Sequence, residues 1–120
     1  MSRELMQKLA DVWEQLAKRR FICTQAAFES QKVVGGVIYG YHAEDNPSAL
    51  LGSSEGGHDF LLVEDRYILD VWAAAYYGYK PIFDLQTDQV EILMLYGPRD
   101  MWIRAVIKDA DTDMFYRLEG

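Results

Sequence analysis

The sequence contains little cysteine, histidine and proline. It has one cysteine, Cys23, two histidines and three prolines in 120 residues. One cysteine cannot form an internal disulfide, so a disulfide-stabilised scaffold is excluded. The two histidines, His42 and His58, do not have the spacing to other ligand residues that zinc or calcium sites require. We therefore expect no metal site and no cofactor, and the sequence contains neither a phosphate-binding loop nor a dinucleotide fingerprint.

Long apolar runs are also missing. No stretch approaches the roughly 18 consecutive apolar residues of a membrane-spanning helix. The N-terminal segment MSRELMQKLADVWEQLAKRR carries charges throughout, unlike the apolar part of a signal peptide. We therefore expect a protein of a reducing cytoplasm with no membrane association, although a non-classical secretion route would leave no pattern in the sequence.

Positive charge is scarce as well. The chain has 12 Lys and Arg against 19 Asp and Glu, a net charge of −7. Such a chain repels a phosphate backbone unless its basic groups cluster. The one basic cluster, Lys18-Arg19-Arg20, falls at the predicted end of a helix, where cations complement the helix dipole. We expect no nucleic-acid binding, whereas the acidic balance is compatible with a basic protein partner.

The sequence does contain enough apolar residues for a core, because half of the residues are apolar and 13% are aromatic. We expect one domain over residues 1–120. Residues 3–19 are predicted to form an amphipathic helix. Its apolar positions are Leu5, Leu9, Val12, Trp13 and Leu16. A second helix is predicted from about Thr24 to Val33, where Gly35 and Gly36 end it.

The remaining pattern predicts β-strands. Residues 37–41 are rich in β-branched and aromatic residues, and the apolar runs 59–63 and 67–71 flank Glu64-Asp65-Arg66 as in a hairpin. Residues 72–77 are predicted to form a helical turn, and residues 90–95 and 101–107 further strands. We therefore expect an α+β fold, with N-terminal helices packed on an antiparallel sheet of about four to five strands.

Cys23 lies where the second predicted helix begins. Unpaired amides and the helix dipole at that position favour a thiolate over a thiol. A lone cysteine ahead of Ala26 and Ala27 fits a small buried side chain equally well. Both interpretations, nucleophile and core residue, stay open.

His58 and Asp70 lie on the two strands of the predicted hairpin. Gly56 and Gly57 precede His58 and allow a close backbone approach where its strand begins. If the hairpin turns about a single residue near Asp65, His58 and Asp70 face the same way, because both positions are even. A carboxylate in an apolar strand needs a partner, and a neighbouring imidazole is one. The alternative is that Asp70 caps the segment that follows it.

Two segments, FICTQAAFES and GGHDFLLVEDRYILDVWA, resemble the papain-like and transglutaminase-like cysteine hydrolase superfamily, in particular its short bacterial effector, toxin and amidase-like branches. In these families a cysteine at a helix start is followed by a strand that begins with His and a second strand that carries Asp or Asn. The likeness covers about residues 20–73. It implies that Cys23 is the nucleophile, His58 the base and then the acid, and Asp70 the group that orients His58. It also implies a papain-like or transglutaminase-like core and a peptide or small acyl or amide substrate.

The sequence departs from the family pattern around Cys23. No aromatic residue follows it directly, no glycine precedes it, and no glutamine lies at the usual short distance upstream. The backbone amides of Cys23 and Thr24 are therefore the candidate oxyanion donors. Trp72 and Gln25 are candidates for a substrate groove, and a plain aromatic core is the alternative for Trp72.

These residues predict a cysteine hydrolase or acyl transferase that acts on an amide or a thioester. The resemblance does not choose between a peptidase, a deamidase and a transglutaminase. A competing hypothesis is a non-catalytic acidic binding protein of the inhibitor or immunity type, which the net charge of −7 and the small size favour. A third is an inactive member of the same fold.

Overall fold

The computed structural model describes residues 3–16, 22–109 and 114–118. The helices are α1 (Arg3–Leu16), α2 (Cys23–Val34), α3 (Val71–Tyr77), α4 (Gln89–Tyr96) and the short 3-10 helix η1 (Arg99–Met101). The strands are β1 (Val37–His42), β2 (Gly57–Val63), β3 (Tyr67–Leu69), β4 (Ile82–Asp84), β5 (Ile103–Asp109) and β6 (Met114–Leu118). The segment Lys18-Arg19-Arg20 and the end of the first predicted helix lie outside the described residues.

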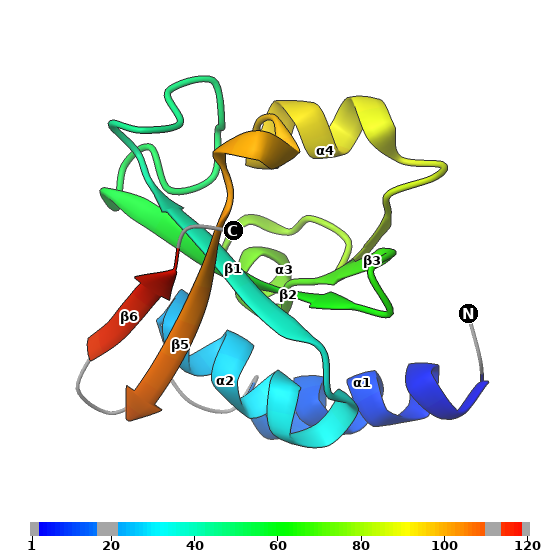
Figure 1. Cartoon of the computed structure of the whole chain (residues 1–120). Helices are drawn as coiled ribbons and strands as arrows, with labels where there is room; N and C mark the ends of the chain where they lie inside the picture. The colour runs from blue at the N-terminus through cyan, green and yellow to red at the C-terminus, as the bar shows by residue number, and fades with distance from the viewer. Residues whose placement is uncertain (1–2, 17–21, 110–113, 119–120) are drawn as a thin grey trace.

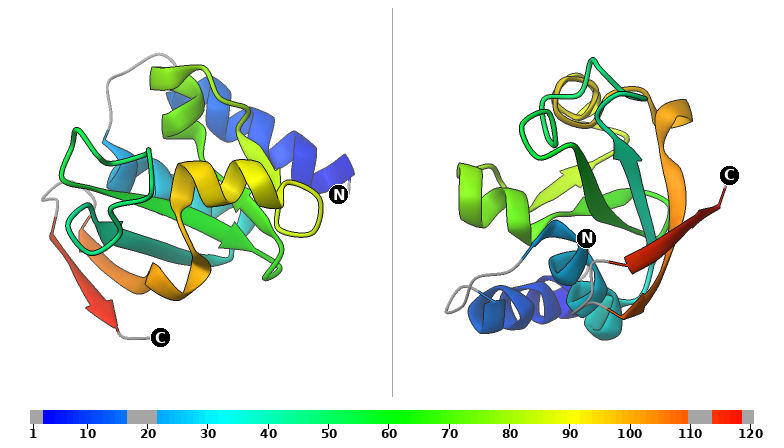
Figure 2. Two further views of the ribbon diagram at one scale, coloured as in Figure 1. Left: turned by 90° about the horizontal axis from the view of Figure 1, so that it is seen from above. Right: turned by 90° about the vertical axis from the view of Figure 1, so that its left-hand side faces the viewer.

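The strands form one antiparallel sheet in the order β4-β3-β2-β1-β5-β6 (Figure 1). Helices α1 and α2 lie along one face of this sheet and α4 lies over the other face (Figures 1 and 2). The predicted α+β class with N-terminal helices on an antiparallel sheet is therefore confirmed. Among the described residues the sheet has six strands. Four of them were predicted, and β4 and β6, which the sequence did not reveal, add to its two ends by pairing with β3 and β5.

The register of the β2–β3 hairpin agrees with the sequence prediction. Val63 pairs with Tyr67 and Leu61 with Leu69, so the hairpin is centred on Asp65. Glu64 and Asp65 adopt φ angles of 55° and 52°, which reverse the chain within a short loop. Residues of equal parity on the two strands therefore face the same side of the sheet. The predicted strand 67–71 is too long, however, because β3 ends at Leu69 and Asp70 is the N-cap of helix α3. Asp70 therefore lies one residue beyond the paired strand, and the start of α3 also sets its position.

The predicted strand over residues 90–95 is wrong, because this segment is helix α4. An unbroken apolar run does not by itself distinguish a strand from a helix. The spacing of its buried residues, Ile92, Leu95 and Tyr96, is the helical i, i+3, i+4 pattern. The exposed apolar residues Val90 and Leu93 on its outer side mask that pattern in the sequence.

The other predicted elements near the site are confirmed, with shifted ends. Helix α2 begins at Cys23, one residue earlier than expected, and ends where Gly35 adopts a φ of 76°. The predicted helical turn after Asp70 is helix α3, which ends at the left-handed Gly78. Strand β5 covers most of the predicted strand 101–107. In the described part of the chain, no helix is both long and apolar enough to cross a membrane.

Candidate functional site

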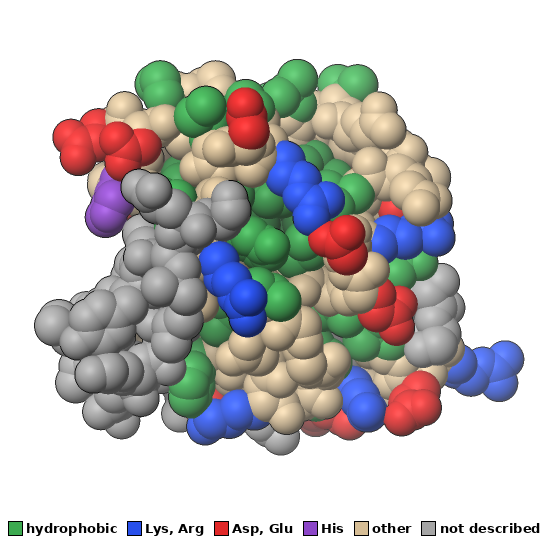
Figure 3. Space-filling model, in the orientation of Figure 1, with side chains coloured by type: hydrophobic (Ala, Val, Ile, Leu, Met, Phe, Trp, Pro, Cys, Tyr) green, Lys and Arg blue, Asp and Glu red, His purple; other side chains and the backbone are tan. Residues whose placement is uncertain are grey.

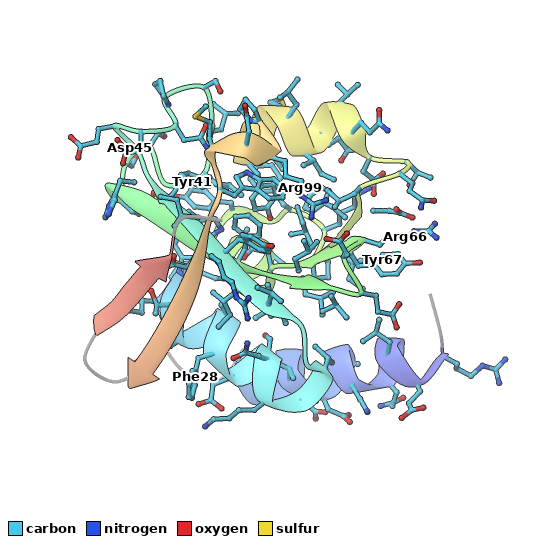
Figure 4. The ribbon with its side chains drawn as sticks, viewed as in Figure 1. Phe28, Tyr41, Asp45, Arg66, Tyr67 and Arg99 are labelled. Carbon is cyan, nitrogen blue, oxygen red and sulfur yellow. The ribbon has the colours of Figure 1, made fainter. Side chains whose placement is uncertain are left out.

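Strand β2 has an open edge next to the candidate site. Its pairing with β3 extends only from Leu61 to Val63, so residues 57–60 have a neighbouring strand on the β1 side alone. This end of β2 is the one near Asp45 in Figure 4, opposite the end near Arg66 and Tyr67. A pocket of about 290 Å³, here called the Cys23 pocket, lies where this edge meets the starts of α2 and α3. It is lined by Ile22, Cys23, Thr24, His42, Glu55, Gly56, Gly57, His58, Asp59 and Trp72.

His58 and Asp70 form a buried pair. His58 Nε2 lies 2.6 Å from Asp70 Oδ2, and the two residues are 1% and 3% exposed. The other carboxylate oxygen, Oδ1, accepts a hydrogen bond from the backbone amide of Ala73 at 2.9 Å. Asp70 therefore contacts the imidazole and also caps helix α3, the second of which is the alternative that the sequence offered. The cap fixes the carboxylate that contacts the imidazole.

A third donor to Asp70 comes from Tyr96, which the sequence did not single out. The Tyr96 hydroxyl donates to Asp70 Oδ2 at 2.7 Å, and the side chain is fully buried. The Tyr96 carbonyl accepts hydrogen bonds from Asn46 Nδ2 and Trp102 Nε1, each at 2.8 Å. Tyr96 is thus held at both its backbone and its hydroxyl. Only the helical spacing of the buried residues in α4 could have identified Tyr96 from the sequence as a core residue.

Aromatic rings surround the His58 imidazole. Its ring centre lies 5.1 Å from that of Trp72, 5.9 Å from that of Tyr96 and 6.0 Å from that of Phe60. Tyr41, directly opposite His58 on β1, lies 6.4 Å away. These rings exclude water from the imidazole and restrict its rotation, which strengthens its electrostatic contact with Asp70.

Opposing effects act on the pKa of His58. Burial lowers this pKa, whereas the charge of Asp70, its hydrogen bond and the nearby Cys23 side chain raise it. The favourable contacts prevail and raise the pKa of His58 from 6.5 to about 10. At neutral pH the pair is therefore an imidazolium beside a carboxylate.

Cys23 and His58 line the same pocket. The cysteine is the first residue of α2 and is half-buried at the pocket. Its side chain is close enough to His58 to raise the pKa of the imidazole. His58 Nδ1 has no partner with full hydrogen-bond geometry among the described residues, although it is buried. Catalytic hydrogen bonds are often loose before substrate binds, so this geometry suits a cysteine and histidine pair.

The neighbours of these two residues bond to each other. Thr24 Oγ1 donates to Asp59 Oδ2 at 2.7 Å, and both side chains are buried. Thr24 directly follows Cys23, and Asp59 directly follows His58. This hydrogen bond fixes the start of α2 against the open edge of β2. It therefore sets the distance between the cysteine and the histidine.

The other predicted site residues have different roles. The backbone hydrogen bonds of α2 begin with the Ala26 amide, which donates to the Ile22 carbonyl at 3.0 Å. The amides of Cys23 and Thr24 come before this point, where a helix leaves its amides without partners inside the helix. Since no hydrogen bond inside the helix occupies them, these two amides can donate to an oxyanion. Gln25 does not line the Cys23 pocket, because its side-chain oxygen accepts the Ile22 amide at 3.2 Å and caps the helix.

Trp72 lines the Cys23 pocket and is at the same time a buried member of the hydrophobic core, which was the alternative interpretation of this residue. Gly57 also has the close approach expected before His58, since a Cβ at this position would lie 2.5 Å from the Tyr41 carbonyl oxygen. Among the described residues, no group of three or more His, Cys, Asp and Glu side chains is placed to hold a metal ion.

Comparisons with known proteins assign no relative to this chain. No protein-family model, curated protein or solved structure gives a significant match. The resemblance to the papain-like and transglutaminase-like superfamily therefore stays a prediction from the residue pattern, and the function has to be argued from the geometry of the site.

Proposed function

We propose that this protein is a cysteine hydrolase or acyl transferase that acts on an amide or a thioester. The observation that carries the proposal is the buried pair of His58 and Asp70 at a pocket that Cys23 also lines, with His58 Nδ1 left without a partner among the described residues. A nucleophile, a base and a group that orients the base are the three parts that thiol catalysis needs.

The first half of the reaction is acyl transfer to Cys23. The thiolate attacks the substrate carbonyl carbon, and a carbon–sulfur bond forms while the carbonyl electrons move to the oxygen. The imidazolium of His58 then gives its Nδ1 proton to the leaving amine or thiol, and the bond to that group breaks. The product is a thioester on Cys23 and a neutral His58.

The second half releases the acyl group. His58 Nδ1 takes a proton from a water molecule or an acceptor amine, which attacks the thioester carbonyl. The carbon–sulfur bond breaks, the thiolate returns and the imidazolium is restored. With water the product is a carboxylic acid, and with an amine it is a new amide. Asp70 stabilises the imidazolium and holds the ring through the hydrogen bond to Nε2.

The start of α2 supplies the electrostatic part of the proposal. A tetrahedral intermediate on Cys23 carries a negative oxygen next to the sulfur. The amides of Cys23 and Thr24 lie at the positive end of the α2 dipole, which stabilises such a charge. Fixed backbone donors need no reorganisation during the reaction.

The experiment that tests the proposal is the rate of Cys23 alkylation by iodoacetamide between about pH 5 and pH 9. We expect fast alkylation at the acid end of this range, and a loss of at least tenfold in His58→Ala. The same protein unfolded in urea gives the intrinsic rate of the thiol. A native thiol that reacts no faster than the unfolded one, with or without His58, would contradict the proposal and favour a non-catalytic binding protein.

A further inference from the structure

The Cys23 pocket carries negative charge beyond that of the proposed catalytic residues. Glu55 and Asp59 both line it, and no described lining residue is a lysine or an arginine. Asp59 is 3% exposed and accepts a hydrogen bond from the Thr24 hydroxyl, so its carboxylate is held in a fixed position in the pocket lining. Glu55 is exposed at the pocket and receives a hydrogen bond from the Tyr77 hydroxyl at the end of α3. This bond joins the two segments that flank the opening.

The chain around the pocket has the same sign of charge. Residues 33–65 include no lysine and no arginine. The exposed Glu44 and Asp45 lie on the β1–β2 connection that also supplies Glu55. Figure 3 shows acidic side chains gathered beside a histidine on this part of the surface, at the upper left, where Figure 4 labels Asp45. A cation that approaches this side meets a complementary field.

The charges converge inside the molecule as well. Burial raises the pKa of Tyr41, and negative charges raise it further. These charges come from Asp70, Cys23, Asp59 and Glu55. All four side chains therefore act on the Tyr41 hydroxyl. The imidazolium of His58 offsets the charge of only one of these groups.

An independent observation marks this pocket as a ligand site. His58 lines it, is 1% exposed and has an Nδ1 without a hydrogen-bond partner. Buried polar atoms are normally paired, so an unpaired one at a pocket indicates a group that is supplied by a ligand. Ile22 and Trp72 add an apolar wall on which the methylene stem of a long cationic side chain can lie.

We propose that the Cys23 pocket selects acyl substrates that carry a positive charge close to the reacting carbonyl, such as an arginine or lysine side chain. This inference rests on the proposed function for its reaction, but the binding itself needs no catalysis. Glu55 faces the cation, and Asp59 contributes to the field from the wall. Indole faces bind cations as well, so Trp72 favours the same substrate class.

The experiment compares two ligands that differ only in charge. Binding of N-acetyl-arginine amide and of the neutral isostere N-acetyl-citrulline amide is measured by calorimetry on Cys23→Ala, which cannot turn either over. We expect the arginine amide to bind at least about fivefold more tightly, and the preference to shrink with added salt, because the effect is a partly exposed charge contact. Equal affinity of the two ligands, or no detectable binding of the arginine amide, would overturn the inference.

A matched pair of variants locates the effect. Glu55→Gln keeps an acceptor for the Tyr77 hydroxyl but removes the charge, and we expect it to weaken arginine amide binding about threefold to tenfold. Asp100→Asn removes one exposed charge on η1, away from the pocket, and we expect it to change binding by less than about twofold. Equal effects of the two variants would assign the preference to net charge and overturn the role of the pocket.

The inference and the proposed function fail in different ways. A protein that binds the arginine amide selectively but has an inert Cys23 thiol would keep the cation site and lose the reaction. A protein with a reactive, His58-dependent thiol that binds both amides equally would keep the reaction and lose the charge preference.

Discussion

The Tyr96 hydroxyl and the His58 Nε2 atom share one oxygen of Asp70, at 2.7 Å and 2.6 Å. The second oxygen of that carboxylate is held by the Ala73 amide. Three donors from β2, α3 and α4 therefore meet at a single buried side chain. Asp70 is consequently fixed in a way that a carboxylate with one partner is not. Tyr96 acts through Asp70 on the orientation of His58.

The first prediction concerns this hydroxyl. Tyr96→Phe removes one donor but keeps the ring that packs on Phe60 and Trp102. We expect the free energy of unfolding in urea to fall by about 1–2 kcal/mol, the cost of a lost buried hydrogen bond.

For the proposed activity, Tyr96→Phe should lower kcat severalfold with little change in KM, because the hydroxyl touches Asp70 and not the substrate pocket. A change in KM alone would assign Tyr96 to substrate binding. An unchanged kcat with the expected loss of stability would show that the hydroxyl has a structural role only.

The second prediction concerns pH. The folded pKa of His58, about 10, lies above its reference value of 6.5. The pair with Asp70 therefore contributes its full stability below about pH 6.5 and loses it as the pH rises toward 10. Urea unfolding of the wild type at several pH values across this window should show a falling free energy.

His58→Gln provides the reference for that measurement, because a glutamine amide does not titrate. It should be less stable than the wild type at the acid end by about 3 kcal/mol, the typical cost of breaking a buried charged pair. The difference between the two proteins should shrink toward the alkaline end. A constant difference across the whole range would contradict the raised pKa.

The third prediction concerns the hydrogen bond between Thr24 and Asp59. Thr24→Val keeps the shape of the side chain but takes one donor away from a buried carboxylate. We expect a loss of about 1–3 kcal/mol in the free energy of unfolding. We also expect Cys23 alkylation to slow severalfold, because the cysteine moves relative to His58.

Thr24→Ser restores the hydroxyl and is the rescue control. It should recover the wild-type alkylation rate even if the lost methyl group costs some stability. If Thr24→Val and Thr24→Ser slow alkylation equally, the methyl packing and not the hydrogen bond positions the cysteine.

The fourth prediction concerns Gly57. A methyl group at this position would meet the Tyr41 carbonyl oxygen at 2.5 Å, so Gly57→Ala must push β1 and β2 apart. We expect a cost of about 1–3 kcal/mol in the free energy of unfolding. Thermal unfolding is a sufficient measurement.

The exposed Gly35 provides the comparison, since a Cβ there meets nothing within 4 Å. Gly35→Ala should lower the free energy of unfolding only because of its positive φ of 76°. If Gly57→Ala is as stable as the wild type, close contact at Gly57 does not limit how β1 and β2 approach.

The pairing of His58 with Asp70 was predictable because it depends on local geometry. The hairpin loop centred on Asp65 returns the chain beside β2, so that Asp70 follows β3 close to His58. Asp70 lies one residue beyond β3, and its role as the N-cap of α3 completes the orientation of its carboxylate. The position of Cys23 at a helix start and the cap at Asp70 are also local properties, since both follow from a few consecutive residues.

The features that the sequence analysis missed depend on contacts between residues that are not close in the sequence, or on patterns that exposed apolar residues hide. The apolar run of α4 carries exposed residues such as Val90 among its buried ones, so its helical pattern was hidden and Tyr96 was missed. The Thr24–Asp59 bond joins positions 35 residues apart, and Gln25 turned from the expected groove to cap its own helix.

The sequence by itself determined the α+β class, the order of the elements around the site and the register of the hairpin, because these depend on side-chain periodicity and turn length. The tertiary structure alone decided which helix covers His58, which hydroxyl reaches Asp70 and which acids surround the Cys23 pocket. Those contacts join separate elements, and their geometry is set by how the helices pack on the sheet and not by any local pattern of residues.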